Sequence, residues 1–331
     1  MTDPDPPSLR TALAPFQRPD TARALAELAY TLVPLLALWG AIYLCVARGW
    51  WLGLALTPLA AIFLVRLFMI QHDCGHQAFL PGSRANAWIG RLIGVLTMTP
   101  YDYWRRTHAI HHATSADLDR RGLGAIETLT VGEYRALGPI RRLGYRLYRH
   151  PLVMLGFGPP YMFLLQHRLP IGVMREGWAW RSVLGNNLGL LLLAAALIPV
   201  VGLEAMLLAH LPVVAFAAAI GVALFYVQHQ FEGVRWKRHD TWEPAAAAIE
   251  GSSHLVLPQP LRWLTANIGA HHVHHASSRI PFYRLPEALD SHAALAGARR
   301  LRGRDLLPAL RLALWDEAAG RLVTFREARP G

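Results

Sequence analysis

Residues 51–76 read WLGLALTPLAAIFLVRLFMIQHDCGH, an apolar run that ends on two histidines, His72 and His76. The run is long enough to cross the hydrocarbon core of a bilayer as a helix, which takes about 20 residues. Histidines four positions apart lie one turn apart on the same face of a helix. The stretch therefore predicts a membrane helix that carries imidazole groups to the membrane surface.

Two further histidine clusters follow, HAIHH at residues 108–112 and HHVHH at residues 271–275. Each contains the pattern H-x-x-H-H, and two such patterns are not expected by chance in a chain with 16 histidines among 331 residues. Imidazole is the commonest metal ligand in proteins and suits iron, copper, zinc and nickel. The three clusters offer too many ring nitrogens for one metal ion and enough for two, so the sequence predicts a metal site.

The composition places this site beside a membrane. Hydrophobic residues make up 53% of the chain and charged residues 17%, which is too apolar for a soluble domain of this size. We expect four membrane-spanning helices in two hairpins, at residues 28–47, 51–70, 183–203 and 206–228. The predicted fold is an all-α integral membrane protein in which residues 71–182 and 229–331 form a helical cap. Residues 1–27 form an N-terminal tail, of which the proline-rich start is expected to be loose.

The sequence also predicts the structure or position of three smaller features. Arg66 is the only basic residue inside a span, and its place near the end of that span predicts that it extends to the membrane interface. The apolar run 151–166 is broken by glycines and prolines, which favours an interfacial or re-entrant element over a fifth span. Leucines at helical spacing with arginines between them predict an amphipathic helix at residues 305–323.

The topology follows from the charges. The net charge of +11 is carried almost wholly by arginines, which crowd both ends of the chain and the long central loop. The positive-inside rule then places both termini and the cap in the cytoplasm, and all three histidine clusters fall on that side. Because the basic residues flank membrane spans, an anionic lipid surface is the expected partner, and nucleic acid is not. Cys45 and Cys74 fall near opposite faces of the membrane, so no disulfide is expected.

Several kinds of metal chemistry do not fit the motifs. A soluble-type di-iron bundle would use Glu-x-x-His pairs and a zinc protease would use H-E-x-x-H, and the sequence contains neither. A structural zinc site would recruit cysteine. A histidine-rich site beside a bilayer is well placed for attack on lipid carbon–hydrogen bonds, which requires O₂ and a metal because an unactivated methylene has no acidic proton.

The clusters HDCGH, HAIHH and HHVHH, in this order and with this spacing of hairpins, resemble the membrane fatty acid desaturases. The resemblance covers roughly residues 66–286 and extends to 112–137, 145–161, 225–232 and 265–287, which look like the bacterial acyl-lipid branch related to delta-12 enzymes. It is weaker between Trp236 and Pro258. The resemblance implies that residues 28–331 form a desaturase domain with a non-haem di-iron centre. Such a centre uses O₂ and two external electrons to introduce a cis double bond into an acyl chain.

The resemblance also implies which residues bind the two iron ions. The carried-over catalytic and metal-ligating residues are His72, His76, His108, His111, His112, His271, His274 and His275. Related desaturases have a further ligand outside the three clusters, and His229 at the end of the fourth span is the best-placed candidate. Its alternative is an interfacial histidine bonded to a lipid headgroup.

Other residues near the clusters have two interpretations each. Asp73 either supports a ligand histidine or faces solvent, and Asn267 either holds an iron-bound water or caps a helix. His272 lies about 100° off the ligand face and is expected to stand behind the ligands or on the surface. Candidates for contact with the acyl chain, which an interfacial aromatic belt explains equally well, are Tyr101, Tyr103 and Trp104.

The electrons must come from a partner. The chain has no haem-attachment motif, no cysteine set for an iron–sulfur cluster and no dinucleotide-binding motif, so a ferredoxin or a cytochrome b5-like protein is expected. A fatty acyl hydroxylase, an acetylenase or a carotenoid-modifying oxygenase would use the same histidines and stays open. A metal transporter is a remote alternative, because it would place ionisable residues along its spans.

Overall fold

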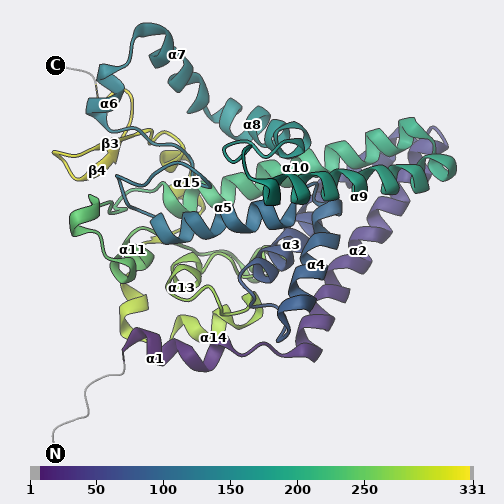
Figure 1. Cartoon of the computed structure of the whole chain (residues 1–331), viewed down its shortest axis with the longest axis horizontal. Coiled ribbons are helices and arrows are strands. Elements are labelled where there is room, and N and C mark those ends of the chain that lie inside the picture. The colour runs from purple at the N-terminus through teal and green to yellow at the C-terminus, as the bar shows by residue number, and fades with distance from the viewer. Residues whose placement is uncertain (1–7, 329–331) are drawn as a thin grey trace, which may run out of the picture.

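The computed structural model describes residues 8–328 and is built mainly from helices (Figure 1). Four of its helices are long and apolar enough to cross a membrane. They are Thr21–Ala47 (α2), Trp51–Gly75 (the 3-10 helix η2, Trp51–Leu56, with α3, Thr57–Gly75), Gly177–Val201 (α9) and Leu203–His229 (α10). The expected four-helix membrane domain is therefore confirmed. In Figure 1 these helices extend toward the right, and the remaining elements gather on the left.

The two hairpins turn at glycines. Gly49 follows α2 with φ of 75°, and Gly202 lies between α9 and α10 with φ of 82°, a conformation that glycine adopts at no steric cost. The third span consequently ends at Val201, two residues earlier than expected, and Gly202 alone lies between it and α10. At the other end, α3 and α10 continue beyond the expected spans to Gly75 and His229. These extensions carry histidines into the cap.

Arg66 does not reach the interface, which corrects the expectation from sequence. Its side chain is fully buried, donates to the Glu27 carboxylate and to Trp263 O, and lies 3.0 Å from Thr31 Oγ1. The guanidinium also lies over the Trp263 ring, 4.0 Å from its centroid. Glu27 belongs to α2, because that helix begins seven residues before the expected span. The ion pair therefore joins α2, α3 and the segment before the third histidine cluster.

Breaking this pair is expected to destabilise the protein strongly. Glu27→Ala leaves the Arg66 charge buried without its counter-ion, a change that typically costs about 3–5 kcal/mol. The measurement is the thermal unfolding midpoint of the detergent-solubilised protein. The matched control is Glu204→Ala, because Glu204 is an exposed carboxylate in the first turn of α10. Equal midpoints for the two variants would contradict this role of the pair.

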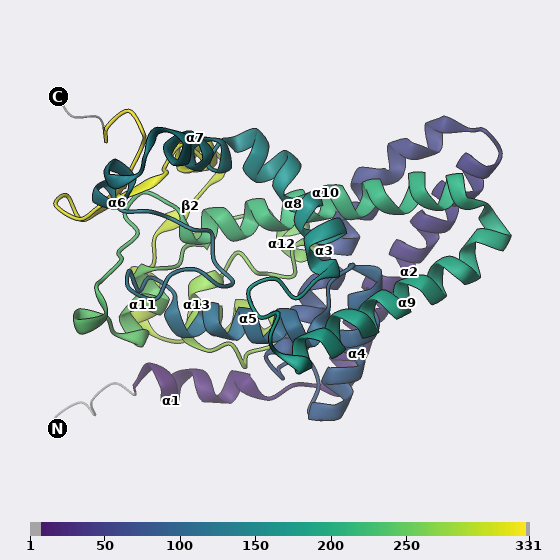
Figure 2. The ribbon, with the colours of Figure 1, turned by 45° about the horizontal axis from the view of Figure 1, so that its top comes forward.

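The cap is made of short helices. They surround those ends of the spans that the sequence predicts to face the cytoplasm. After α3 come α4 (Ser83–Leu96) and α5 (Tyr101–Thr114), and both of these helices pack against α3 and α9. The other helices of the cap are α6 (Val131–Ala136), α7 (Pro139–Tyr148), η6 (His239–Thr241), α11 (Pro244–Glu250), α12 (Gln259–Leu264), α13 (His271–Ala276), η7 (Phe282–Arg284), α14 (Leu285–Leu289), η8 (Ala293–Gly297) and α15 (Gly303–Ala309). Figure 2 shows α5 and α13 side by side within the cap, with α11 next to α13.

The two ends of the chain differ from expectation. Residues 1–7 lie outside the described residues, but α1 (Leu9–Leu13) and η1 (Ala14–Gln17) are packed, with Leu13 fully buried and Gln17 Nε2 3.0 Å from Ser277 Oγ. The prediction of a loose start is thus wrong for residues 9–17. The helix expected at 305–323 is also wrong: after α15 the chain forms the antiparallel strands β3 (Leu314–Asp316) and β4 (Arg321–Val323). Asp316 Oδ1 accepts two backbone N–H groups of the connecting turn, which favours the hairpin over a helix.

The segment 151–168 does not form a fifth span. It consists of two short π-helical stretches, η3 (Leu152–Phe157) and η4 (Tyr161–Leu165), separated by α8 (Gly158–Pro160) and followed by η5 (Gln166–Arg168). Successive prolines at 159 and 160 remove backbone donors, so a regular α-helical ladder cannot run through the segment. The segment packs along α10 (Figure 1). One small parallel pair, β1 (His254–Leu255) with β2 (Arg300–Leu301), completes the cap.

Candidate metal centre

Five histidines from three elements converge in a first group. One potential ligand atom of each lies within 4.8 Å of those of the others. His108 Nε2 is 3.1 Å from both His76 Nε2 and His112 Nε2, and His274 Nε2 is 3.1 Å from His112 Nε2. Helices α3, α5 and α13 supply this first group, which consists of His72, His76, His108, His112 and His274.

Four histidines form a second group. His229 Nε2 at the end of α10 lies 3.1 Å from His111 Nε2 and 3.0 Å from His271 Nε2. His275 joins them, with potential ligand atoms of His111, His229 and His275 all within 4.8 Å. The second group therefore brings one histidine from outside the three clusters together with histidines of the second and third clusters.

The two groups are adjacent because α5 and α13 each contribute to both. On α5, His108 and His112 point to the first group and His111 to the second. The rings of His112 and His275, one from each group, stack with centroids 4.1 Å apart. Helical spacing explains this split. His108 and His112 are four residues apart and share one face of α5, whereas His111 directly precedes His112 and is turned away from it by about 100°.

Burial favours the neutral form of the histidines that the cap contributes to the two groups. Burial lowers the pKa of His108, His111 and His274 well below the ordinary value for histidine, and the neighbouring imidazoles lower it further. The same holds for His76, His112, His271 and His275. Neutral imidazole is the ligand form, so no proton has to be displaced near neutral pH.

The spacing of the nitrogens fits ions with more than four ligands. A metal–nitrogen bond of about 2.1 Å places two ligands at right angles about 3.0 Å apart, whereas the tetrahedral angle would place them farther apart. The separations between His76, His108 and His112 match the right angle. Structural zinc is almost always four-coordinate, and five imidazoles in the first group exceed that number. The donor set of the first group thus fits a metal ion with more than four ligands better than it fits structural zinc.

Asp73 stands directly behind the first group. Its side chain is buried, so the solvent-facing interpretation is wrong. One carboxylate oxygen lies 3.2 Å from His72 Nδ1, and the other accepts the backbone N–H of Phe282 at 2.6 Å. A carboxylate on the far nitrogen of an imidazole orients the ring and raises its basicity as a ligand. Asp73 also ties α3 to the segment after α13.

Two other candidates lie outside both groups. His272 is fully buried, so its surface interpretation is wrong, and its ring lies 5.5 Å from that of His254. Asn267 adopts a left-handed conformation with φ of 55°, and its Nδ2 donates to Phe282 O. Asn267 is not the N-cap of α13, which is Ala270. It joins the loop before the third cluster to the segment after it.

A large apolar cavity adjoins the first group. Its volume is about 780 Å³, and His72, His108 and His271 form part of its wall. The rest of the wall comes from α3, α5, α10 and the segments 122–127 and 153–172, and is mostly apolar. Cavities of this size bind small molecules in many proteins. An unbranched hydrocarbon chain is the kind of ligand that such a wall favours.

The three aromatic candidates for substrate contact differ in position. Tyr103 and Trp104 line the cavity, and the Trp104 ring stacks on His108 with centroids 4.6 Å apart. Tyr101 does not line it: its buried hydroxyl donates to Cys74 O. The ring of Tyr101 instead closes against Gly90 of α4, where a Cβ atom would lie 2.2 Å from it. Tyr101 and Tyr103 are both buried, which does not fit an interfacial belt.

Two residues beside the second group have no signal in the sequence. The Phe225 ring lies 5.0 Å from that of His111 and 5.1 Å from that of His229. Gly124, with φ of 81°, lies where a Cβ atom would be 2.4 Å from Thr107 O and 3.3 Å from His111 Cβ. Both residues enclose the second group, but one phenylalanine in a span and one glycine in a loop do not stand out without the fold.

The family model for fatty acid desaturases matches residues 48–304, which include all nine histidines of the first and second groups. The chain belongs to the fatty acid desaturase family. A fatty acid desaturase from Bacillus subtilis is 42% identical over 318 residues, covering 96% of this chain and 90% of the relative. This relationship confirms the resemblance inferred from the histidine clusters, and it places the chain among oxidoreductases rather than transporters.

More distant desaturases are named for particular lipid substrates. An sn-1 oleoyl-lipid 12-desaturase from Picosynechococcus is 26% identical, covering 78% of this chain and 74% of the relative. An sn-1 acyl-lipid omega-3 desaturase (ferredoxin) from Synechocystis is 24% identical, covering 70% of this chain and 64% of the relative.

Proposed function

We propose that the protein introduces a cis double bond into the acyl chain of a membrane lipid, using O₂, a pair of iron ions and external electrons. The observation that carries this proposal is the contact between the two histidine groups and the apolar cavity. The cavity would hold the acyl chain, and the groups beside it would hold the metal. The relatives named for oleoyl-lipid and acyl-lipid substrates support a lipid as the acyl carrier.

The residues of the two groups would hold one iron ion each, with His72, His76, His108, His112 and His274 on the first and His111, His229, His271 and His275 on the second. When bound, iron supplies the oxidising chemistry with O₂ that an unactivated methylene requires. Asp73 would orient His72 through its Nδ1. Trp104 would fix the path of the acyl chain beside His108, because its ring stacks on His108 and lines the cavity.

The cavity wall would also keep water from the acyl chain. Phe68, Trp104 and Phe163 meet edge to face, with Phe68 5.2 Å from Trp104 and 6.0 Å from Phe163 between ring centroids. These three aromatic rings are part of the lining. Excluding water from the reacting carbons prevents side reactions and holds the chain in one position relative to the histidines.

The fatty acid profile of cells that express the gene tests this proposal. We expect a new unsaturated fatty acid with a cis double bond, located by gas chromatography of suitable derivatives. A hydroxylated or acetylenic fatty acid in its place would favour the corresponding oxygenase instead, and an altered carotenoid with unchanged fatty acids would do the same for a carotenoid-modifying enzyme. An unchanged lipid profile from cells that contain folded, iron-loaded protein would contradict the proposal.

The proposed orientation has both termini and the cap in the cytoplasm, where an electron donor is available. Arginines are numerous on the cap, and the side chains of Arg120 and Arg235 are more than half exposed. A basic surface attracts an acidic redox partner over a range set by the ionic strength. A ferredoxin or a cytochrome b5-like protein is the class of partner that we propose.

Turnover is therefore expected to require a separate donor protein and to weaken as salt is raised. Surface attraction is screened within about 10 Å at 0.1 M salt, so the donor concentration needed for half-maximal rate should rise with ionic strength. The measurement is double-bond formation in vesicles with a purified ferredoxin and its reductase. Full turnover with a reduced nicotinamide cofactor alone would show that this dependence is wrong.

A further inference from the structure

A second, smaller cavity reaches the metal centre from another side. It has a volume of about 40 Å³ and touches His111 and His229 of the second group. Its lining also contains Thr114, Ser115, Asp117 and Arg121, at the end of α5 and in the loop that follows it. A buried site needs roughly 10–15 Å³ to hold one water molecule, so this cavity has room for a short file of water.

The small cavity is separated from the apolar cavity by a shared wall. Ala125, Ile126 and Phe225 line both. Most of the lined surface of the small cavity is apolar, but its lining includes the polar residues Thr114, Ser115, Asp117 and Arg121. We refer to it as the polar cavity because of these residues, and it gives the centre a second approach. Phe225 contacts His111 and His229 and so closes the wall next to the second group.

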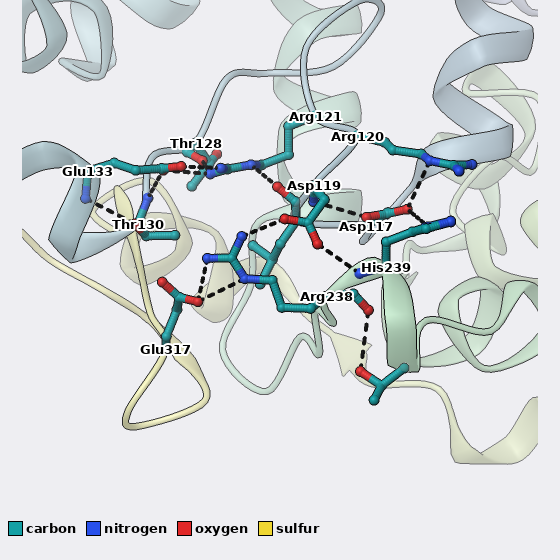
Figure 3. A network of polar contacts seen from close by, with 12 residues as sticks. Asp117, Asp119, Arg120, Arg121, Thr128, Thr130, Glu133, Arg238, His239 and Glu317 are labelled. Carbon is teal, nitrogen blue, oxygen red and sulfur yellow. Dashed lines mark hydrogen bonds and ion pairs between the residues drawn. The ribbon is translucent and has the colours of Figure 1, made fainter.

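Asp117 connects the polar cavity with the surface of the cap. Asp117 is one of the residues that line the cavity, and it is buried, with the residue 1% exposed. One carboxylate oxygen accepts the backbone N–H of Asp119 at 3.0 Å, and the other accepts His239 Nδ1–H at 2.8 Å. The His239 side chain is 45% exposed. Figure 3 shows this pair, with the dashed line between the Asp117 carboxylate and His239.

Charged side chains around the pair hold it in place. Arg120 Nε lies 3.9 Å from the same Asp117 oxygen that faces His239. Arg238 bonds both Asp119 and Glu317 and so ties the loop after α5 to the β3–β4 turn. On the other side, Arg121 bonds Glu133, at the start of α6 (Figure 3). Lys237 pairs with Asp117 through its backbone. A buried carboxylate beside an exposed histidine is thus built into a fixed network.

We propose that this polar cavity is the route by which water and protons are exchanged between the metal centre and the cytoplasm, with His239 and Asp117 as its proton relay. The inference rests on the proposed function. Forming a double bond with O₂ follows CH₂–CH₂ + O₂ + 2 e⁻ + 2 H⁺ → CH=CH + 2 H₂O, so protons must enter and water must leave in each turnover. The apolar cavity filled by an acyl chain cannot carry either. His239 takes a proton from solvent, Asp117 receives it, and water in the cavity carries it toward the second group.

The first test measures water access in the metal-free protein and needs no activity. Ser115 lines the cavity and is buried, and Ser252 is buried but lines neither cavity. With the two native cysteines as background, the thiol of Ser115→Cys is expected to be oxidised by hydrogen peroxide, a reagent close to the size of water, at least about tenfold faster than that of Ser252→Cys, because oxidation requires access. Equal protection of both new thiols would overturn the water route, whether or not the protein is a desaturase.

The second test addresses the relay in the iron-loaded protein with its donor. Asp117→Asn keeps the shape of the side chain but cannot pass a proton, so turnover should fall by a factor on the order of 10². The solvent deuterium isotope effect should rise, and a small weak acid such as formic acid should restore part of the rate. The control is Asp119→Asn, in the same network but outside the cavity lining, which should change neither the isotope effect nor the response to acid.

Two outcomes decide between the parts of the proposal. If Ser115→Cys is accessible but Asp117→Asn behaves like Asp119→Asn in isotope effect and rescue, the relay through Asp117 is overturned. Loss of turnover in Asp117→Asn without a larger isotope effect and without rescue would mean that the carboxylate only holds the loop, which also overturns the relay. If the unaltered protein forms no double bond, the proposed function is contradicted. The water route is then judged by the accessibility of the new thiols alone, because that test does not depend on activity.

Discussion

His229→Ala is expected to lose iron from the second group and nearly all activity, whereas His272→Ala keeps both iron ions and measurable turnover. His229 Nε2 lies between His111 Nε2 and His271 Nε2, at 3.1 and 3.0 Å, so its removal takes the central nitrogen from that group. His272 is adjacent to His271 in sequence, but it points toward His254 and belongs to neither group. The two variants thus make the same chemical change at a residue inside the second group and at one outside it.

Iron content and double-bond formation, measured on the same purified samples, check this expectation. The thermal unfolding midpoint of the metal-free variants serves as the control for folding, because both histidines are buried and either substitution removes packing. The reverse pattern, with iron lost from His272→Ala and retained by His229→Ala, would mean that the register of the third cluster is wrong.

The second large effect concerns the first group. The unaltered protein is expected to carry about two iron ions per chain, and His108→Ala or His274→Ala should abolish product and lower the iron content. His108 Nε2 lies 3.1 Å from two other ligand candidates, so no neighbouring group can replace it. His150→Ala is the control, because His150 is exposed and lies outside both groups. Stoichiometric zinc together with full activity after iron chelation would contradict the assignment of iron.

Local pattern was sufficient to predict the spans and the convergence of the clusters. Apolar runs of about 20 residues have one stable arrangement in a bilayer, since every backbone polar group must be bonded internally. The H-x-x-H-H spacing fixes which histidines share a helix face, so α5 and α13 could be expected to serve two neighbouring ions. The charge distribution placed the clusters on one side of the membrane, and the fold brings them together at the ends of α3 and α10.

Features that depend on packing between distant segments were missed. Arg66 looked like an interfacial residue because its partner, Glu27, lies before the apolar run that marks the first span. Leucine spacing suggested a helix near the C-terminus, but Trp315 and Leu322 pair across a hairpin instead. The wall formed by Phe225 could not be predicted either, because a phenylalanine in an apolar span has no distinguishing pattern. For Arg66 and Phe225 the deciding contact joins residues far apart in the sequence.

The central claim is that the nine histidines hold two iron ions next to an acyl cavity. Its most direct test is anomalous scattering from crystals of the iron-loaded protein, recorded on both sides of the iron absorption edge. We predict two peaks, one among the Nε2 atoms of His76, His108 and His112 and one among those of His111, His229 and His271. A single peak, or two peaks that scatter as zinc in a fully active sample, would contradict the claim.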